Sequence, residues 1–313
     1  MADNFSKNIV TGLTQKPKKL SSKYFYDEKG DQLFQAIMKM EEYYLTNSEY
    51  EIFSLQKDQI LQHVLISNEP FQLIEFGAGD GLKTKLLLEF LVTIKANFEY
   101  IPIDISRNIL EKLQGDLKAK WPKLICKPRS NTYFEALRNL SSDKVKLVLF
   151  LGSNIGNFNL KEAKAFISEV NENLNSGDFF LMGVDLKKDP ELILNAYNDK
   201  GGITKAFNLN LLDRINKELE GNFRTENFSH FPTYDPISGE TRSFLISKSR
   251  QTVELKKLNK TIEFDYAEPI FMETSKKYDI DELDSIASKT NFEIIEHFYD
   301  CKHYFVDTLW RKK

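Results

Sequence analysis

The chain of 313 residues carries a formal net charge of −3, and 41% of its residues are hydrophobic, which is enough for one large or two modest globular domains. The small net charge gives no electrostatic basis for binding nucleic acid or a membrane surface, so we expect neither as a partner. The two cysteines, Cys126 and Cys301, and the four histidines have no metal-ligand spacing, so we expect a reducing compartment and no metal site.

The segment before the first strand is expected to contain a loose arm and two helices. Residues 1–22 are polar and lysine-rich and lack the apolar core of a signal peptide, so we expect a loosely held arm on a cytoplasmic protein, which we take to be a monomer. Apolar spacing predicts helices over 31–40 and 46–60. Tyr26 and Tyr43 flank these helices, and two interpretations of them stay open: packing in a core, or contact with a ligand.

A glycine turn between a buried strand and a helix is the central feature of the sequence. The apolar run 73–76 predicts one buried strand, and Gly77, Gly79 and Gly81 follow it. Glycines allow the chain to turn tightly and a ligand to approach the backbone. A helix is expected from Lys83, and the N–H groups at its start are available to a polar ligand. Strand, glycine turn and helix together indicate a nucleotide-binding α/β unit.

The next predicted strand, 98–104, ends in an acid, Asp104. A carboxylate at this position can accept hydrogen bonds from both ribose hydroxyls of a bound nucleoside. The alternative is that Asp104 is the N-cap of the following helix. The glycine turn lacks a third glycine at the spacing typical of phosphate binding, which favours S-adenosylmethionine (SAM) over NAD as the ligand.

The strand–helix alternation continues and predicts a parallel sheet with helices on both faces. A short third strand is expected near 124–126 and a strong fourth one over 145–151. Gly152, Asn154 and Asn157 follow the fourth strand, in the place where open α/β sheets bind ligands. The alternative interpretation of this segment is a capped loop before the next helix.

After a fifth strand over 178–184 the alternation stops, and an insertion over about 188–277 is expected. It contains two helical stretches and then segments that alternate like antiparallel strands. One helix and two closing strands then complete the sheet with an antiparallel hairpin at its edge. The predicted fold is therefore α/β. We assign residues 48–187 and 278–313 to a nucleotide-binding domain, and residues 10–47 and 188–277 to a second, α+β domain.

Several segments taken together resemble one family over nearly the whole chain. They are KYFYDEKGDQLF (23–34), EEYYLTNSEYEI (41–52), LIEFGAGDGLKT (73–84), YIPIDIS (100–106), FLGSNIGNF (150–158), AYNDKGGITKAFN (196–208) and METSKKY (272–278). The glycine-turn segment is generic, whereas YFYD, EYY, GSNIGN and AYND are far more specific. The chain thus resembles the SAM-dependent histidine Nα-methyltransferases of the ergothioneine pathway.

The resemblance implies a class I methyltransferase fold, which is Rossmann-like, with a second substrate-binding domain formed by the N-terminal segment and the insertion. For the cofactor, SAM, it implies contacts with Gly77, Gly79, Lys83, Asp104, Thr132 and Tyr133. For the amino acid it implies contacts with Phe34, Tyr43, Gly152, Asn157, Tyr197, Glu273 and Ser275. The last two are expected to face the imidazole. Tyr26 and Asn157 are expected to act in catalysis by orienting the amine, and because neither is a base near neutral pH, we expect solvent to take the amine proton.

The expected activity is methylation of the α-amino group of free L-histidine to trimethylhistidine (hercynine). Three departures from the family are present, one of which is Asn154 in place of a loop threonine. Thr132 and Tyr133 stand where an acid and an aromatic residue often contact the adenine, and Ser243 stands where a large apolar residue lines the imidazole pocket. Two alternatives stay open: methylation of another amino acid or amine, such as tryptophan, and a SAM-binding protein without turnover.

Overall fold

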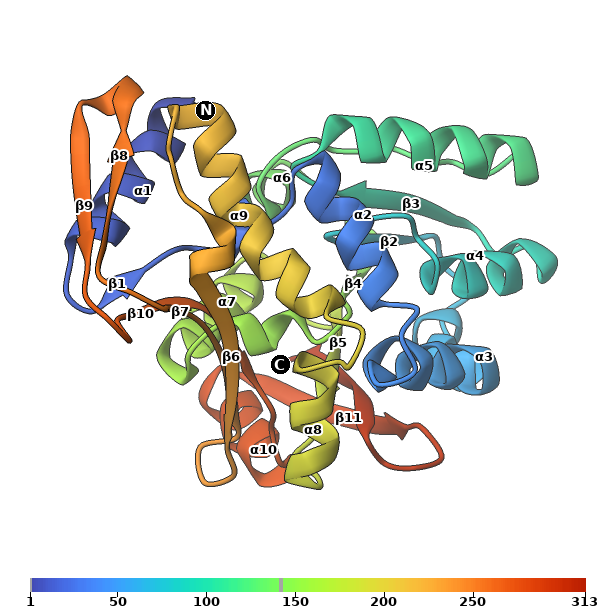
Figure 1. The fold of residues 1–313 in the computed structure, drawn as a ribbon. Helices are drawn as coiled ribbons and strands as arrows, with labels where there is room; N and C mark the ends of the chain where they lie inside the picture. Colours follow the sequence, from blue (N-terminus) through green and yellow to red (C-terminus); the bar gives the residue numbers. More distant parts are fainter. Residues whose placement is uncertain (1, 141–142) are drawn as a thin grey trace. The chain divides into compact units, whose positions relative to one another are not determined.

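The computed structural model describes residues 2–140 and 143–313, and the chain divides into two compact units (Figure 1). The first unit consists of Leu45–Lys187 and Lys277–Lys313, and we call it the large-sheet unit. The second consists of Met1–Tyr44 and Lys188–Lys276, and we call it the small-sheet unit. In the part of the chain that the structure describes, no helix is both long and apolar enough to cross a membrane.

Within the described part of the large-sheet unit, six strands form one sheet. In spatial order they are β11 (Phe292–Tyr299), β12 (Phe305–Lys312), β5 (Phe179–Asp185), β4 (Val145–Phe150), β2 (Phe71–Phe76) and β3 (Phe98–Ile103). β2 is parallel to β3 and β4, and β4 is parallel to β5. β12 runs antiparallel to both β5 and β11. The predicted parallel sheet with a closing antiparallel hairpin is therefore confirmed, as is the Rossmann-like α/β fold class.

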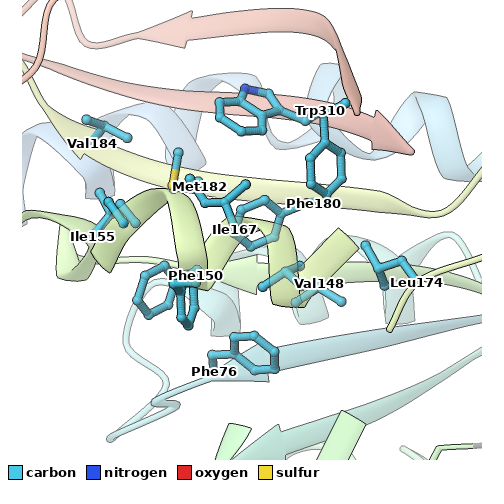
Figure 2. Close-up of a cluster of buried hydrophobic side chains, with 14 of the residues drawn as sticks. Phe76, Val148, Phe150, Ile155, Ile167, Leu174, Phe180, Met182, Val184 and Trp310 are labelled. Atoms are coloured by element: carbon cyan, nitrogen blue, oxygen red, sulfur yellow. The ribbon is translucent and has the colours of Figure 1, made fainter. Parts of the chain in front are cut away.

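Helices connect and cover these strands. They are α3 (Tyr44–Leu65), α4 (Thr84–Thr93), α5 (Arg107–Lys120), α6 (Tyr133–Arg138), α7 (Leu160–Glu172) and α10 (Ile280–Lys289). Figure 2 shows side chains of β2, β4, β5, β12 and α7 meeting in one apolar cluster, with Phe150, Ile167 and Trp310 among them. Full burial of one large apolar side chain contributes about 1.5–3 kcal/mol to folding stability. The packed cluster therefore holds the ends of these strands in fixed positions.

The predicted third strand near 124–126 is wrong as a regular strand. This segment runs parallel to β3 and forms two isolated bridges, Tyr100 with Cys126 and Ile103 with Arg129. Pro102 of β3 lies between Tyr100 and Ile103 and has no N–H to donate to this segment, although its carbonyl accepts the N–H of Arg129. The ladder is interrupted for this reason, and the segment only lines the sheet edge.

Within the described part of the small-sheet unit, four strands form a sheet and two more form a hairpin. The sheet consists, in spatial order, of β1 (Lys18–Lys19), β10 (Pro269–Lys276), β7 (Glu240–Ser247) and β6 (Phe228–Asp235), and the hairpin of β8 (Gln251–Leu255) and β9 (Lys260–Phe264). The helices are α1 (Ala2–Thr14), α2 (Glu28–Ile37), α8 (Pro190–Tyr197) and α9 (Ile203–Leu219). The sequence did not predict β6, which contains Pro232. Proline is tolerated there because β6 is an edge strand.

The predicted loose arm at residues 1–22 is also wrong. α1 places Phe5, Ile9 and Leu13 in the core of the small-sheet unit, where each is at most 4% exposed. The chain then adds β1 to the sheet, in parallel with β10. The apolar residues recur every four positions among polar ones, so the helix buries a narrow stripe although its composition is polar.

Candidate functional site

The glycine turn after β2 has the backbone that the sequence predicts. Gly77, Gly79 and Gly81 have φ angles of +68°, +53° and +65°, a region that favours glycine. The N–H of Gly77 donates to Ile103 O at 2.8 Å, which ties the turn to the end of β3. A Cβ on Gly77 would lie 3.0 Å from the Tyr133 hydroxyl, so this position accepts no larger residue without movement.

Asp104 lies beside this turn. Its Oδ1 accepts the N–H of Ser106 at 2.9 Å, and its Oδ2 lies 3.4 Å from the N–H of Gly79. The N-cap of α5 is Ser106, whose hydroxyl accepts the N–H of Ile109 at 3.4 Å. The alternative interpretation of Asp104 as the N-cap is therefore wrong, and its carboxylate is turned towards the glycine turn.

Tyr133 and Thr132 lie at the start of α6. The Tyr133 ring stacks on Phe76 with a centroid distance of 4.8 Å and an interplanar angle of 9°. Burial, with a smaller effect of the Asp104 charge, raises the pKa of Tyr133 to about 12, so its hydroxyl stays protonated. Thr132 is the N-cap of α6, and its N–H and hydroxyl donate to Glu135 at 3.2 and 2.7 Å. The contact of both residues with an adenine stays a prediction.

Lys83, the N-cap residue of α4, forms an ion pair with Glu49 of α3. Glu49 is fully buried and also accepts the N–H of Gly152, at 2.8 Å to Oε1 and 3.0 Å to Oε2. One carboxylate therefore joins the start of α4 to the end of β4, two places where ligand contacts are predicted. Sequence reasoning missed Glu49, because nothing in its local pattern on α3 separates it from the other acids of that helix.

Glu75, two residues before the glycine turn, was also missed. It is buried in β2 and accepts hydrogen bonds from Thr84, at 2.5 Å, and from the Tyr100 hydroxyl. Burial raises the pKa of Glu75 to about 7, although both hydrogen bonds oppose the rise. An acid inside an otherwise apolar strand was the signal that could have identified it.

The loop after β4 uses its polar residues in different ways. The Asn154 side chain donates to Leu151 O at 2.7 Å, and the Ser153 hydroxyl accepts the N–H of Asp185 at 3.0 Å. Both bonds fix the loop, so the capped-loop interpretation holds for these two residues. Asn157, at the end of the short 3-10 helix η2 (Asn154–Asn157), is exposed and is the member of the segment with a side chain accessible to a ligand.

In the small-sheet unit, the structure brings Tyr26 and Phe34 together. Their ring centroids are 5.5 Å apart, and Phe207 of α9 lies 5.7 Å from Tyr26 and 5.9 Å from Phe34. Tyr26 is 47% exposed, so this aromatic group lies at the surface of the unit. Tyr43 is half-buried and packs against the apolar core of the same unit.

A bulge in β10 decides where Glu273 and Ser275 point. Phe271 pairs with Phe244 of β7, but Glu273 already pairs with Ser243, so Met272 is the extra residue. Residues directly opposite each other in an antiparallel pair share a face, and a one-residue shift moves the following side chains to the other face. Glu273 and Ser275 therefore share the face of the sheet that carries the buried Ser243.

Tyr197 and His230 add polar groups to this unit. The Tyr197 hydroxyl donates to Ser275 Oγ at 2.8 Å, so two residues predicted for the substrate site are in contact. His230 of β6 lies with its Nε2 3.5 Å from Ser243 Oγ. Burial lowers the pKa of His230 to about 4, so its ring is neutral at physiological pH. Sequence reasoning did not identify His230 as a site residue, because it lies on β6, an edge strand that the sequence did not predict.

These positions fit a nucleoside carrying an amino acid better than a metal ion. The glycine turn leaves backbone open beside the Asp104 carboxylate and the Tyr133 ring, which suits a ribose and a base. Across residues 2–140 and 143–313, no group of three or more histidine, cysteine or acidic side chains is placed to hold a metal ion.

Comparison with known proteins gives a consistent set of relatives. The chain matches the family described as histidine-specific, SAM-dependent methyltransferases over residues 5–312. It is 30% identical to the histidine N-alpha-methyltransferase of Mycolicibacterium smegmatis, over 88% of this chain and 85% of that protein. The protein of the same name from Mycobacterium tuberculosis is 30% identical over 87% of this chain and 84% of its own length. Ergothioneine biosynthesis protein 1 of Neurospora crassa is 31% identical over 90% of this chain, which spans 32% of that protein.

Proposed function

Because the chain belongs to the family of SAM-dependent, histidine-specific methyltransferases, we propose that it methylates the α-amino nitrogen of free L-histidine to give trimethylhistidine. The observation that carries the choice of histidine is the shared face of Glu273 and Ser275 on β10. We further propose that the enzyme acts as a monomer in the cytoplasm on this small-molecule substrate, without nucleic acid or a membrane as partner.

The imidazole ring explains why this pair of side chains suits histidine. A neutral imidazole has one nitrogen that donates and one that accepts a hydrogen bond. The Glu273 carboxylate can accept the ring N–H, and a serine hydroxyl such as Ser275 can donate to the other nitrogen. The Tyr197 hydroxyl donates to Ser275 Oγ, which orients that serine. Amino acids with apolar side chains can make neither of these two hydrogen bonds, so the site discriminates against them.

Bound SAM supplies an electrophilic methyl group on a sulfonium. In the large-sheet unit, we propose that the nucleoside is held by Gly77, Gly79 and Asp104. The adenine base is contacted by Thr132 and Tyr133. The Lys83 ammonium would bind the carboxylate of the amino-acid part of SAM. A neutral amine that is held in line with the methyl group needs little acid–base help, so orientation by Tyr26 and Asn157 is the main contribution of the protein to the rate.

Incubation of the purified protein with SAM and, separately, histidine, tryptophan, histamine or buffer tests the proposal. Mass spectrometry is expected to show one, two and then three added methyl groups on histidine, and little product from histamine, which lacks the α-carboxylate. Preferential methylation of tryptophan would support the alternative substrate. Binding of SAM without any product would support a protein without turnover.

Replacing Asp104 by alanine is expected to weaken the affinity for SAM about ten- to a hundredfold. A hydrogen bond to a charged group contributes about 1.5–3 kcal/mol, and the turned-in carboxylate is the proposed partner of the ribose. Titration calorimetry checks the affinity. Asp80→Ala is the matched control, because Asp80 is an exposed acid in the same turn whose Oδ1 accepts the N–H of Leu82. An unchanged affinity in Asp104→Ala would refute the ribose contact.

A further inference from the structure

Three ionisable side chains of the large-sheet unit form a cluster, and a cofactor contact is proposed for only one of them, Lys83. They are Glu49 of α3, Lys83 at the start of α4 and Asp307 of β12. Glu49 and Asp307 are fully buried, whereas the Lys83 side chain keeps 20% of its surface exposed. A buried charge is costly unless it is paired, so each carboxyl group needs its own explanation.

Glu49 has two partners, and both belong to the edge of the sheet where ligand binding is proposed. It is paired with Lys83 Nζ and accepts the N–H of Gly152 with both carboxylate oxygens. A Cβ on Gly152 would lie 3.5 Å from Lys83 Nζ, so the ammonium lies directly over this glycine. An ammonium has three donors. Glu49 therefore fixes the position of Lys83 and leaves it able to donate to a second anion.

Asp307 differs from Glu49 although it lies beside it. It is directly opposite Gly183 of β5 in the sheet. A Cβ on Gly183 would overlap Glu49 Oε1 and would lie 3.2 Å from Asp307 Oδ1. Both carboxyl groups therefore pack against the same glycine. Among the described residues, neither oxygen of Asp307 has a hydrogen-bond partner. Burial, and secondly the charge of Glu49, raises the pKa of Asp307 well above its usual range.

We propose that Glu49 is a positioning residue for the methyl donor, and that it holds the Lys83 ammonium over Gly152 so that this cation meets the donor's carboxylate. Asp307 is a neutral acid that packs against Glu49 without adding a second negative charge. The anion and the cation of the cluster then balance each other, and an ionised Asp307 would instead repel an incoming carboxylate. The inference rests on the proposed use of SAM.

Two ligands separate positioning from a general structural role. S-adenosylhomocysteine carries the amino-acid part of the donor, and methylthioadenosine lacks it. Glu49→Gln is expected to weaken S-adenosylhomocysteine about tenfold and methylthioadenosine less than twofold, measured by calorimetry. The glutamine would turn an N–H group towards Gly152 N or Lys83 Nζ, so the ammonium loses its place. Charge alone predicts the opposite sign, since removal of an anion beside Lys83 would tighten the binding of a carboxylate.

Asp307→Asn is the matched variant, because an amide has the shape of a neutral acid. Its affinities for S-adenosylhomocysteine and for methylthioadenosine are both expected to stay within twofold of those of the wild type. Lys83→Met should show the same selective loss as Glu49→Gln, and the double variant should be no weaker than Lys83→Met alone. Where thermal unfolding shows that Glu49→Gln does not fold, Lys83→Met still tests the inference, because the absence of a selective loss would remove the contact that Glu49 is proposed to position.

Several results would overturn the inference. They are tighter or unchanged binding of S-adenosylhomocysteine by Glu49→Gln or Lys83→Met, equal weakening of both ligands, and a selective loss in Asp307→Asn. A wild type that does not bind S-adenosylhomocysteine would contradict the use of SAM itself, which is a different failure.

Discussion

Replacing Lys277 by methionine is expected to lower the free energy of unfolding of the large-sheet unit by about 3–5 kcal/mol. Lys277 Nζ lies 2.7 Å from Asp185 Oδ2, and both side chains are fully buried. The variant removes the cation and leaves the carboxylate at the end of β5 without its counter-charge in a dry environment. The cost is that of an uncompensated buried charge rather than of a lost contact.

Urea unfolding followed by tryptophan fluorescence measures this loss, because Trp121 and Trp310, the two tryptophans of the chain, both lie in the large-sheet unit. Lys120→Met is the matched control. Lys120 pairs with Glu89 at 3.1 Å, but both side chains are more than half exposed, so the cost should not exceed about 1 kcal/mol. The double variant Lys277→Met with Asp185→Asn should regain part of the loss. Equal stability of the two single variants would show that the buried pair is not a stabilising one.

Features that depend on neighbouring residues were predictable from the sequence. β2 reads as a short apolar run followed by glycines, and the structure buries every residue of the strand and gives Gly77 and Gly79 positive φ angles. Asp104 follows β3 directly, so its place at the strand end was fixed by its position in the chain. Local periodicity and turn chemistry are sufficient for such features.

Features that depend on contacts between distant segments were not predictable. Glu49 pairs with Lys83, which lies 34 residues later in the sequence, and no local pattern predicts this pair. Lys277 follows another lysine in a polar stretch that reads as a surface loop, yet it is fully buried. α1 was missed for a related reason, since its apolar stripe gains meaning only from the core it packs against. In each case tertiary burial overrides the local composition.

The bulge at Met272 shows the same limit at the proposed substrate site. A spacing of two residues predicts that Glu273 and Ser275 share a face if the strand is extended, and β10 has this geometry. Which face they share is set by the one extra residue, because a shift of one position turns every later side chain over. Without the bulge they would lie on the face of Phe271.

Replacing Glu273 by alanine is expected to raise the KM for histidine at least tenfold and to leave the KM for SAM within twofold. The carboxylate is proposed to accept the imidazole N–H, and a charge-assisted hydrogen bond contributes about 1.5–3 kcal/mol. The wild type should also reject leucine and phenylalanine by a factor of about 10⁴, since a site built for polar groups is left unpaired by an apolar ligand. In Glu273→Ala this factor should fall, because the alanine no longer penalises an apolar side chain.

Thr274→Ala is the control that isolates the face of the strand. Thr274 lies next to Glu273 and pairs with the exposed Arg242, on the other face of the sheet, where its hydroxyl donates to Thr241 O at 3.3 Å. It should leave the KM for histidine within twofold, because its side chain lies on the other face of the sheet from Glu273 and Ser275 and its hydrogen bond to Thr241 is made to the backbone carbonyl. Methylation kinetics with varied histidine and then varied SAM give both constants for each variant.

If Glu273→Ala methylates histidine as well as the wild type does, the carboxylate is not the imidazole partner. A matching rise in Thr274→Ala would instead mean that any change in β10 disturbs the site, and the two variants together therefore separate recognition by the carboxylate from damage to the strand.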